Sequence, residues 1–433
     1  MKKLMITLFL AACSFFQALA DHYVSPGGTN NPPYTNWADA ATNIQWAVDV
    51  ATNNETVWVT NGTYVLTNQI FITNAIILKS VNGRDLTFIN GNYPNITNRC
   101  IKLTNTLAVV DGFTVSNGYS PSDIEEGNGA GVYIYKGTIR NCVIRENTST
   151  NQGGGIYVHA VGTAALITNC IIAHNRLPLP GLYGAGVALR AGKISTCTVA
   201  SNEIYLSGTT RERYGAGINT SAQNNYIVIE NCIVEANVST NVGAAETTTG
   251  GGIYAWAGTT IRNCLIRGNR SKSAAGGLAL FGNTGYTTTV ENCTIAENYC
   301  EGYGGGMLIS YSSWKHLRNN IIYGNTAGTS GSNYYLNYAN CTNAAFSNNC
   351  FLPELSGAAT NFAQNNINTD PLFNNPTDGD YRLPQRSPCV NAGSNQPWMT
   401  LDLDGRSRID RFSGIVDMGA YEFVFNGTIY RIP

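Results

Sequence analysis

Aromatic and basic side chains recur beside a repeated glycine-rich segment, and they are the residues of this chain that could do chemistry. If the apolar residue after each glycine cluster points inward, as for Val132 and Ile156, alternate residues of the same strand point outward. These outward residues include Tyr133, Tyr135, Tyr157, His159, Arg190, Tyr254, Trp256 and Phe281. Flat aromatic faces bordered by hydrogen-bonding groups suit sugar rings. The pattern predicts a glycan-binding stripe; the alternative is that the aromatic residues pack beneath neighbouring loops.

Catalysis by this stripe has a narrow set of candidates. A glycosidase needs two carboxyl groups about 5–10 Å apart, and the stripe contains none. Tyr157 and His159, two residues apart on one face, could form a metal-free β-elimination pair. In a calcium-assisted lyase, Arg190 or His159 could serve as the base. The alternative is that these three are ordinary surface residues.

A metal site has one candidate, an acidic loop that contains Asp123, Glu125 and Glu126. Carboxylates bind Ca²⁺, so calcium is the cofactor that this loop could hold; otherwise no cofactor is expected. The segment 402–405 (Asp-Leu-Asp-Gly) has part of a calcium-loop pattern but lacks the remaining ligands. A turn whose carboxylates pair with Arg406 or Arg408 is the favoured interpretation.

The elements that must position these residues are internal repeats. Glycine clusters start at positions 129, 153, 184, 215, 250, 276 and 304, and each is followed by an apolar strand and a second signal. That signal is a cysteine followed by an asparagine that ends the repeat, at 147, 175, 202, 237, 269 or 298. We call these residues the closing asparagines. The cysteines stand at 142, 170, 197, 232, 264 and 293, with Asn320 in the next copy, so the repeats are 27–35 residues long. Such a period is typical of solenoids.

Short Ile, Val, Leu and Tyr runs without helical periodicity make each repeat a β coil. The sequence predicts an all-β fold, a single-stranded right-handed parallel β-helix of about nine to eleven coils, with three short strands in each turn. Glycine at the head of the first strand permits a tight corner. The closing asparagines are predicted to take left-handed corners, and their amides are predicted to stack from coil to coil.

The repeated cysteines are predicted to form an inward stack of buried thiols that act as small hydrophobic residues. Disulfides between neighbouring coils are the alternative. Metal binding is poorly supported because the chain has no CxxC pair and the row is one-dimensional. Titrating thiols in denaturant distinguishes the first two possibilities.

Both ends of a solenoid must be covered. Residues 44–51 place Ile44, Ala47 and Val48 on one helical face, which predicts a short N-terminal capping helix. The boundaries that we expect are 1–20 for a signal peptide, 21–100 for the N-terminal cap and first coils, 101–350 for the regular coils and 351–433 for an irregular C-terminal cap. Longer repeats place projecting loops at 121–128, 207–214 and 240–249.

Composition and the N-terminus bound the location and partners. Charged residues are 12% of the 433, and the net charge of −1 leaves no basic footprint for nucleic acid. Lys2 and Lys3 precede an apolar run that ends at Ala20, which predicts cleavage near Ala20 and a secreted, cell-surface or periplasmic protein without a transmembrane segment. A lipid anchor on Cys13 is the alternative.

Together the coils and the C-terminal segment resemble exported right-handed parallel β-helix proteins of the pectin-lyase-like type. The segment is similar to the choice-of-anchor Q region in five places, which are residues 370–373, 380–383, 387–393, 402–405 and 417–423. The resemblance implies glycan binding along the first sheet, with no catalytic residues to carry over.

We therefore expect an exported β-helix that binds a polysaccharide or cell-surface glycan along its first parallel sheet. The alternatives are a polysaccharide lyase that cleaves an acidic polysaccharide by β-elimination and a structural or adhesive surface protein without a defined ligand. The sequence does not specify the oligomeric state.

Overall fold

The computed structural model describes residues 20–121, 127–159, 165–178, 182–206, 213–221, 227–241, 248–282, 285–310, 314–337, 344–352 and 363–424. Most of the predicted signal peptide, Cys13 and the acidic residues Asp123, Glu125 and Glu126 lie outside these ranges. The predicted projecting loops also fall largely outside them.

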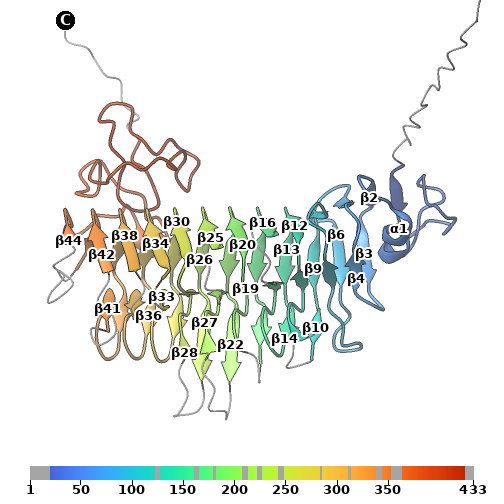
Figure 1. Cartoon of the computed structure of the whole chain (residues 1–433), viewed down its shortest axis with the longest axis horizontal. Coiled ribbons are helices and arrows are strands. Elements are labelled where there is room, and N and C mark those ends of the chain that lie inside the picture. The colour runs from blue at the N-terminus through green and yellow to red at the C-terminus, as the bar shows by residue number, and fades with distance from the viewer. Residues whose placement is uncertain are drawn as a thin grey trace, which may run out of the picture.

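The chain winds as a long solenoid whose strands stack into parallel sheets (Figure 1). Neighbouring strands of each sheet come from successive turns, as in β11, β15 and β19, which pair in parallel register. This is the predicted parallel β-helix, and its 10- and 11-stranded sheets agree with the expected nine to eleven coils. The 10-stranded sheet contains the strands on which the sequence predicts the aromatic stripe.

The 10-stranded sheet contains the strand that follows each glycine cluster. Its members are β4 (Ile70–Ile72), β7 (Ile101–Leu103), β11 (Val132–Ile134), β15 (Ile156–Val158), β19 (Val187–Leu189), β24 (Ile218–Thr220), β29 (Ile253–Ala255), β33 (Leu278–Leu280), β37 (Met307–Ile309) and β41 (Tyr334–Leu336).

The 13-stranded sheet follows next in each turn. It consists of β1 (His22–Val24), β2 (Thr56–Val59), β5 (Ile77–Ser80), β8 (Val109–Asp111), β12 (Gly137–Arg140), β16 (Ala165–Thr168), β20 (Gly192–Ser195), β25 (Ile227–Glu230), β30 (Thr259–Arg262), β34 (Thr287–Glu291), β38 (Trp314–Arg318), β42 (Ala344–Ser347) and β44 (Ala363–Gln364).

The 11-stranded sheet contains the strand after each repeated cysteine. It consists of β3 (Gly62–Val65), β6 (Thr87–Asn90), β9 (Thr114–Ser116), β13 (Val143–Arg145), β17 (Ile171–Ala173), β21 (Thr198–Ala200), β26 (Ile233–Glu235), β31 (Leu265–Arg267), β35 (Thr294–Ala296), β39 (Ile321–Tyr323) and β43 (Cys350–Phe351).

A fourth strand per turn corrects the prediction of three. The residues after each closing asparagine stay extended for two to four positions and pair from coil to coil, giving an 8-stranded sheet. It consists of β10 (Tyr119–Ser120), β14 (Thr148–Ser149), β18 (Arg176–Leu177), β22 (Glu203–Leu206), β27 (Val238–Asn241), β32 (Arg270–Ser271), β36 (Tyr299–Cys300) and β40 (Thr326–Ala327). A small pair, β23 (Arg213–Tyr214) and β28 (Thr248–Thr249), lies beside it.

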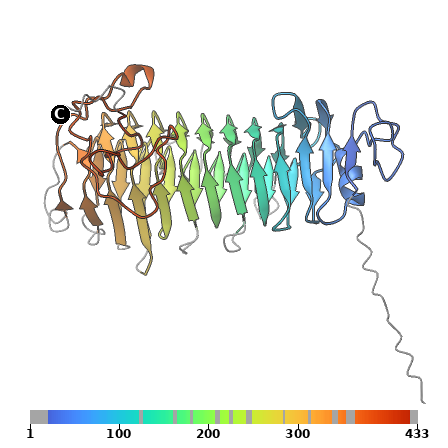
Figure 2. The same cartoon turned by 90° about the horizontal axis from the view of Figure 1, so that it is seen from above.

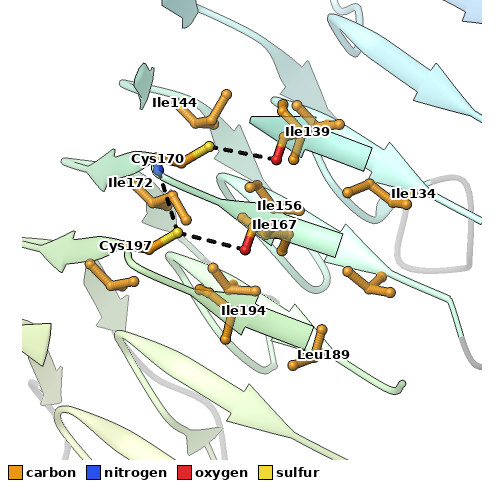
Figure 3. Packing of buried hydrophobic residues seen from close by; sticks show 14 of the residues in the cluster. Ile134, Ile139, Ile144, Ile156, Ile167, Cys170, Ile172, Leu189, Ile194 and Cys197 are labelled. Atoms are coloured by element: carbon orange, nitrogen blue, oxygen red, sulfur yellow. Dashed lines mark hydrogen bonds between the residues drawn. The ribbon is translucent and has the colours of Figure 1, made fainter. Parts of the chain in front are cut away.

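The predicted cysteine stack is confirmed inside the solenoid. Cys142, Cys170 and Cys197 are buried in one continuous core with the inward Ile and Val residues of the sheets. Figure 3 shows the backbone N–H of Cys170 donating to the Sγ of Cys197 at 3.4 Å. The ten described cysteines are unpaired thiols, so coil-to-coil disulfides are absent among them.

We expect these thiols to be unreactive in the native protein. All ten described cysteines are buried, so a reagent cannot reach them in the folded protein. Burial also raises the pKa of Cys142 and Cys170 in the stack, that of Cys100 to about 12 and that of Cys300 to about 11, and only the thiolate attacks a disulfide reagent. Titration with a thiol reagent is expected to label at least ten cysteines in denaturant and none of the ten buried ones before unfolding. Fewer than ten in denaturant would mean that disulfides form between coils.

The closing asparagines form the predicted amide ladder. From Asn147 through Asn175, Asn202 and onward to Asn325, each side-chain Nδ2 donates to the Oδ1 of the next asparagine at about 3 Å. Asn320, in the cysteine position, starts a second ladder by donating from Nδ2 to Asn349 Oδ1.

The predicted left-handed corners occur at different residues from those expected. The residues with positive φ are the one before each closing asparagine, such as Glu146 (φ 56°), and the one before each cysteine, such as Asn141 (φ 56°). The prediction that the closing asparagines take the left-handed conformation is therefore wrong. They instead point inward, where their amides have the buried partners described above. Glycines such as Gly153 (φ 63°) take the remaining tight corner, as predicted.

The N-terminal helix is confirmed as α1 (Ile44–Val50), which begins after the N-cap Asn43. Ile44, Ala47 and Val48 are buried against the first strands. At the other end, residues 363–424 form irregular structure apart from β44 and a short 3₁₀ helix, η3 (Pro376–Asp378). This C-terminal region lies against the outer side of the last coils (Figures 1 and 2).

The C-terminal region is attached to the outer side of the 11-stranded sheet. Tyr381 and Tyr421 pack on Leu265 and Ala296 of that sheet. The asparagines in the left-handed corners also bind the C-terminal region. The side chains of Asn263, Asn292 and Asn319 donate hydrogen bonds to the backbone carbonyls of residues 401, 417 and 394. One column of asparagines thus turns the chain and fixes this region.

Candidate functional site

The candidate site lies on the outer face of the 10-stranded sheet, where strand register stacks equivalent side chains into two columns. The first column contains Phe71, Lys102, Tyr133, Tyr157, Ala188, Asn219 and Tyr254. The second follows the strand ends and contains Tyr135, His159, Arg190, Trp256 and Phe281. The prediction that these side chains leave the core is confirmed, because Tyr133 and Tyr157 form a separate cluster with Ala188.

A cluster of cations and aromatic rings occupies the earlier coils. Lys102 Nζ lies 5.3 Å from the centroid of the Tyr133 ring, and the guanidinium of Arg99 lies 5.0 Å from the same ring. Arg190 lies 5.7 Å over Tyr157. Cations over aromatic faces are mutually stabilising. Three positive side chains therefore converge on two neighbouring tyrosines; we call these five residues and His159 and Tyr135 the basic–aromatic cluster.

His159 is at the centre of this cluster. Its Nδ1 and the Tyr133 hydroxyl are hydrogen-bonded at 3.2 Å, and its ring stacks on Tyr135 with centroids 4.8 Å apart. Tyr157, the partner proposed from sequence, lies edge to face with His159 at a centroid distance of 6.4 Å. Tyr133 therefore provides the hydroxyl that is hydrogen-bonded to His159. The Tyr157 ring instead contacts Tyr133 and Arg190.

A second aromatic group occupies the later coils. Tyr183, Tyr214 and Tyr254 form a continuous stack with centroid distances of 5.5 and 4.2 Å. Phe281 stacks on Tyr254 at 5.0 Å, and Trp256 lies parallel to the Tyr254 ring at 6.2 Å. Ala188 and Asn219 separate this group from the basic–aromatic cluster in the first column.

The accessibility of the stripe differs between its columns. Tyr133, Tyr157 and Tyr254 are at most 4% exposed, so for them the expected open surface is wrong and the packed alternative holds. Their rings are covered in part by the neighbouring cations and rings described above. Tyr135 is 37% exposed, whereas His159, Arg190, Trp256 and Phe281 are half-buried. A ligand would meet the second column first.

Sequence reasoning missed five members of the site. Phe71, Lys102 and Arg99 precede the first glycine cluster. Only counting back from Tyr133, by one coil to Lys102 and by two coils to Phe71, would have found these two residues. Tyr183 and Tyr214 each directly precede a Gly-Ala-Gly cluster, a signal that was present in the sequence.

The acidic candidates do not add to this site. Asp123, Glu125 and Glu126 lie outside the described residues. In the 402–405 turn, Asp402 accepts from the backbone N–H groups of Asp404 and Arg406, while Asp404 pairs with Arg382 at 2.6 Å. Within the described ranges, no group of three or more His, Cys, Asp or Glu residues is arranged to hold a metal ion.

Comparison with known proteins supports the fold. A family model described as "Right handed beta helix region" matches residues 99–287. Together with the coil topology, this match defines the fold as an all-β right-handed parallel β-helix. No curated protein matches the chain. Across the described residues, no helix is both long and apolar enough to cross a membrane.

Solved structures are similar to this chain at low sequence identity. The crystal structure of pectate lyase Pel9A is 15% identical, with 94% of this chain and 97% of that chain covered and a TM-score of 0.52. The complex of XylC with xylose is 9% identical, covering 94% and 99%, with a TM-score of 0.46. The PL6 family polysaccharide lyase Pedsa3628 from Pseudopedobacter saltans is 12% identical, covering 81% and 97%, with a TM-score of 0.39.

Proposed function

We propose that this protein binds an acidic polysaccharide along the outer face of its 10-stranded sheet. The observation that carries the proposal is the basic–aromatic cluster, in which Lys102, Arg99 and Arg190 converge on stacked tyrosines beside His159. Cations attract the carboxylates of uronic acid units, and aromatic faces pack on the C–H surfaces of sugar rings. The pectate lyase likeness is compatible with this proposal through the shared fold.

Binding is expected to depend on both charge and aromatic surface. Lys102→Met and Arg190→Met should each raise the Kd for an acidic polysaccharide about tenfold, because each removes one charge-assisted contact. Trp256→Ala should also weaken binding if the ligand continues along the second column. Affinity electrophoresis or calorimetry with acidic and neutral polysaccharides measures these effects.

The matched control is Arg145→Met, which removes a half-exposed cation from the 11-stranded sheet, where it pairs with Glu146 at 3.2 Å. It should leave binding unchanged. Equal affinity for neutral and acidic polysaccharides, or binding that is insensitive to Lys102→Met and Arg190→Met, contradicts the proposal.

The Tyr133–His159 hydrogen bond favours β-elimination as a second candidate function. In the tautomer that donates from Nδ1 to the Tyr133 oxygen, Nε2 of His159 is the proton acceptor. It would take the proton at C5 of a uronate unit, the C4–C5 double bond would form, and the C4–O bond would break with a solvent proton going to the leaving oxygen. Arg190 would neutralise the carboxylate during the step.

Incubating the protein with the same acidic polysaccharides distinguishes binding from cleavage. Ultraviolet absorbance of an unsaturated product, with and without calcium, reports elimination. If the protein is a lyase, His159→Ala should abolish the product while binding persists. Binding without any product leaves the first proposal and removes the second.

A further inference from the structure

A cavity separates the C-terminal region from the corner that follows the 11-stranded sheet. Its volume is about 310 Å³. The coil side contributes Glu297 and Tyr323, and the C-terminal region contributes Asp370, Phe373, Tyr381 and Arg386. It lies on a different sheet from the basic–aromatic cluster, so it is a separate site.

The coil corner leaves room for this cavity because of glycine. Glu297 takes the left-handed corner conformation (φ 55°), and Gly268 and Gly324 occupy the same corner in the coils before and after it. A Cβ atom at either glycine would meet nothing within 4 Å. Earlier coils have Glu146, His174 and Ser201 at this corner. The Glu297 side chain therefore stands between two positions without side chains.

Aromatic rings form the inner wall. Phe373 meets Tyr381 edge to face, with centroids 5.2 Å apart at 83°, and meets Tyr323 similarly at 6.4 Å and 74°. Rings set nearly at right angles present both faces and edges to the cavity. Such walls suit the C–H faces of a small ring and also a cationic group.

One buried polar group in the cavity wall has unused hydrogen-bonding capacity. Tyr381 is 1% exposed, yet among the described residues its hydroxyl has no hydrogen-bond partner. Burial and the neighbouring Glu297 raise the pKa of this hydroxyl, which keeps it protonated. A buried polar group without a partner is costly, so the geometry favours a ligand that supplies one.

Charge at the rim has a negative excess. Glu297, Asp370 and Arg386 are exposed at the opening. No ion pair joins any of the three to another charged group of the described residues. Two carboxylates against one guanidinium favour a ligand with one positive charge.

We propose that this cavity binds an amine-bearing sugar unit, with its ammonium group between Glu297 and Asp370 and its ring against Phe373 and Tyr323. The Tyr381 hydroxyl then hydrogen-bonds a ligand oxygen. A bare metal ion is a poorer occupant, because the lining offers two carboxylates and the volume holds a whole sugar ring. An acidic sugar would meet both carboxylates and is disfavoured.

A charge series on one sugar ring tests the ligand class. Titration calorimetry or ligand-observed NMR of the purified protein would use glucosamine, glucose and glucuronate at a pH where the amine is protonated. Glucosamine should bind saturably and at least tenfold more tightly than glucose, and glucuronate should not bind. Equal binding of glucosamine and glucose, or no binding of glucosamine, overturns the proposal.

Three variants localise the binding. Glu297→Gln should raise the Kd for glucosamine about tenfold and leave glucose unaffected, because only the charge changes. Tyr381→Phe keeps the ring packed and should weaken both sugars several-fold. Glu146→Gln changes the same corner on an earlier coil, away from the cavity, and should have no effect. Binding that survives both Glu297→Gln and Tyr381→Phe places the amine site elsewhere and rejects this cavity.

This experiment is independent of the proposed function on the 10-stranded sheet. Lys102→Met is expected to weaken the acidic polysaccharide and leave glucosamine binding intact, whereas Glu297→Gln should do the reverse.

Discussion

Asn237→Leu is expected to lower the free energy of unfolding by about 4 kcal/mol, because it interrupts the buried amide ladder at its centre. Asn237 is fully buried. Its Oδ1 accepts from both the backbone N–H and the Nδ2 of Asn202, and its Nδ2 donates to the Val199 carbonyl and to Asn269 Oδ1. Leucine fills a similar volume but leaves the Asn202 N–H and the Val199 carbonyl buried without these partners.

The control for this prediction is Cys232→Ala in the same coil. It removes a buried thiol of the core and breaks no bond of the ladder, so a loss of about 1–2 kcal/mol is expected from the cavity alone. Urea unfolding followed by circular dichroism measures both variants. If Asn237→Leu loses no more than Cys232→Ala, the ladder is not a main source of stability.

The solenoid was predictable from sequence because every coil repeats the same physical requirement. A residue such as Val132 stacks on Ile156 and Val187 in successive coils, so an inward apolar position must recur at the coil period. The same holds for Cys142 and for Asn147. Repetition turned weak local preferences into a strong prediction of the fold and of its buried columns.

The corner geometry was not predictable in the same way. Two asparagines occur in most coils, and the sequence pattern does not say which one takes positive φ. Asn141 turns the chain, while Asn147 uses its amide in the ladder. Both roles suit asparagine chemically, so only the backbone path separates them.

The candidate site was half predictable. Period-two alternation placed Tyr133, His159 and Arg190 on the correct face. It could not show that Tyr133 is buried under Arg99 and Lys102, since that depends on side chains of an earlier coil. The cavity beside Tyr381 was also beyond reach, because it forms only where residues 363–424 meet the coils.

The attachment of the C-terminal region depends on a buried ion pair. Arg408 is fully buried, and its guanidinium donates to Glu422 Oε1 at 2.6 Å, to the Gly419 carbonyl at 2.9 Å and to Asn263 Oδ1 of the coil. Burial raises the pKa of Glu422 to about 8, although the positive charge of Arg408 acts to lower this pKa. The pair therefore joins this region to the corner column of asparagines.

Arg408→Met is expected to weaken the attachment by about 3–5 kcal/mol, because it removes the buried hydrogen bonds that the guanidinium donates to Glu422, Gly419 and Asn263. The coils should persist, so far-UV circular dichroism changes little while hydrogen exchange of residues 363–424 accelerates. Arg382→Met, which removes a partly exposed partner of Asp404, should cost at most about 1 kcal/mol.

Because the raised pKa of Glu422 means that the docked state binds a proton, its contribution to docking is fully present below about pH 4.5 and is lost as the pH rises toward 8. Protection of residues 363–424 in the unmodified protein should therefore fall as the pH rises from about 4.5 toward 8. Equal exchange in Arg408→Met and the unmodified protein at neutral pH would show that the pair does not hold the region in place.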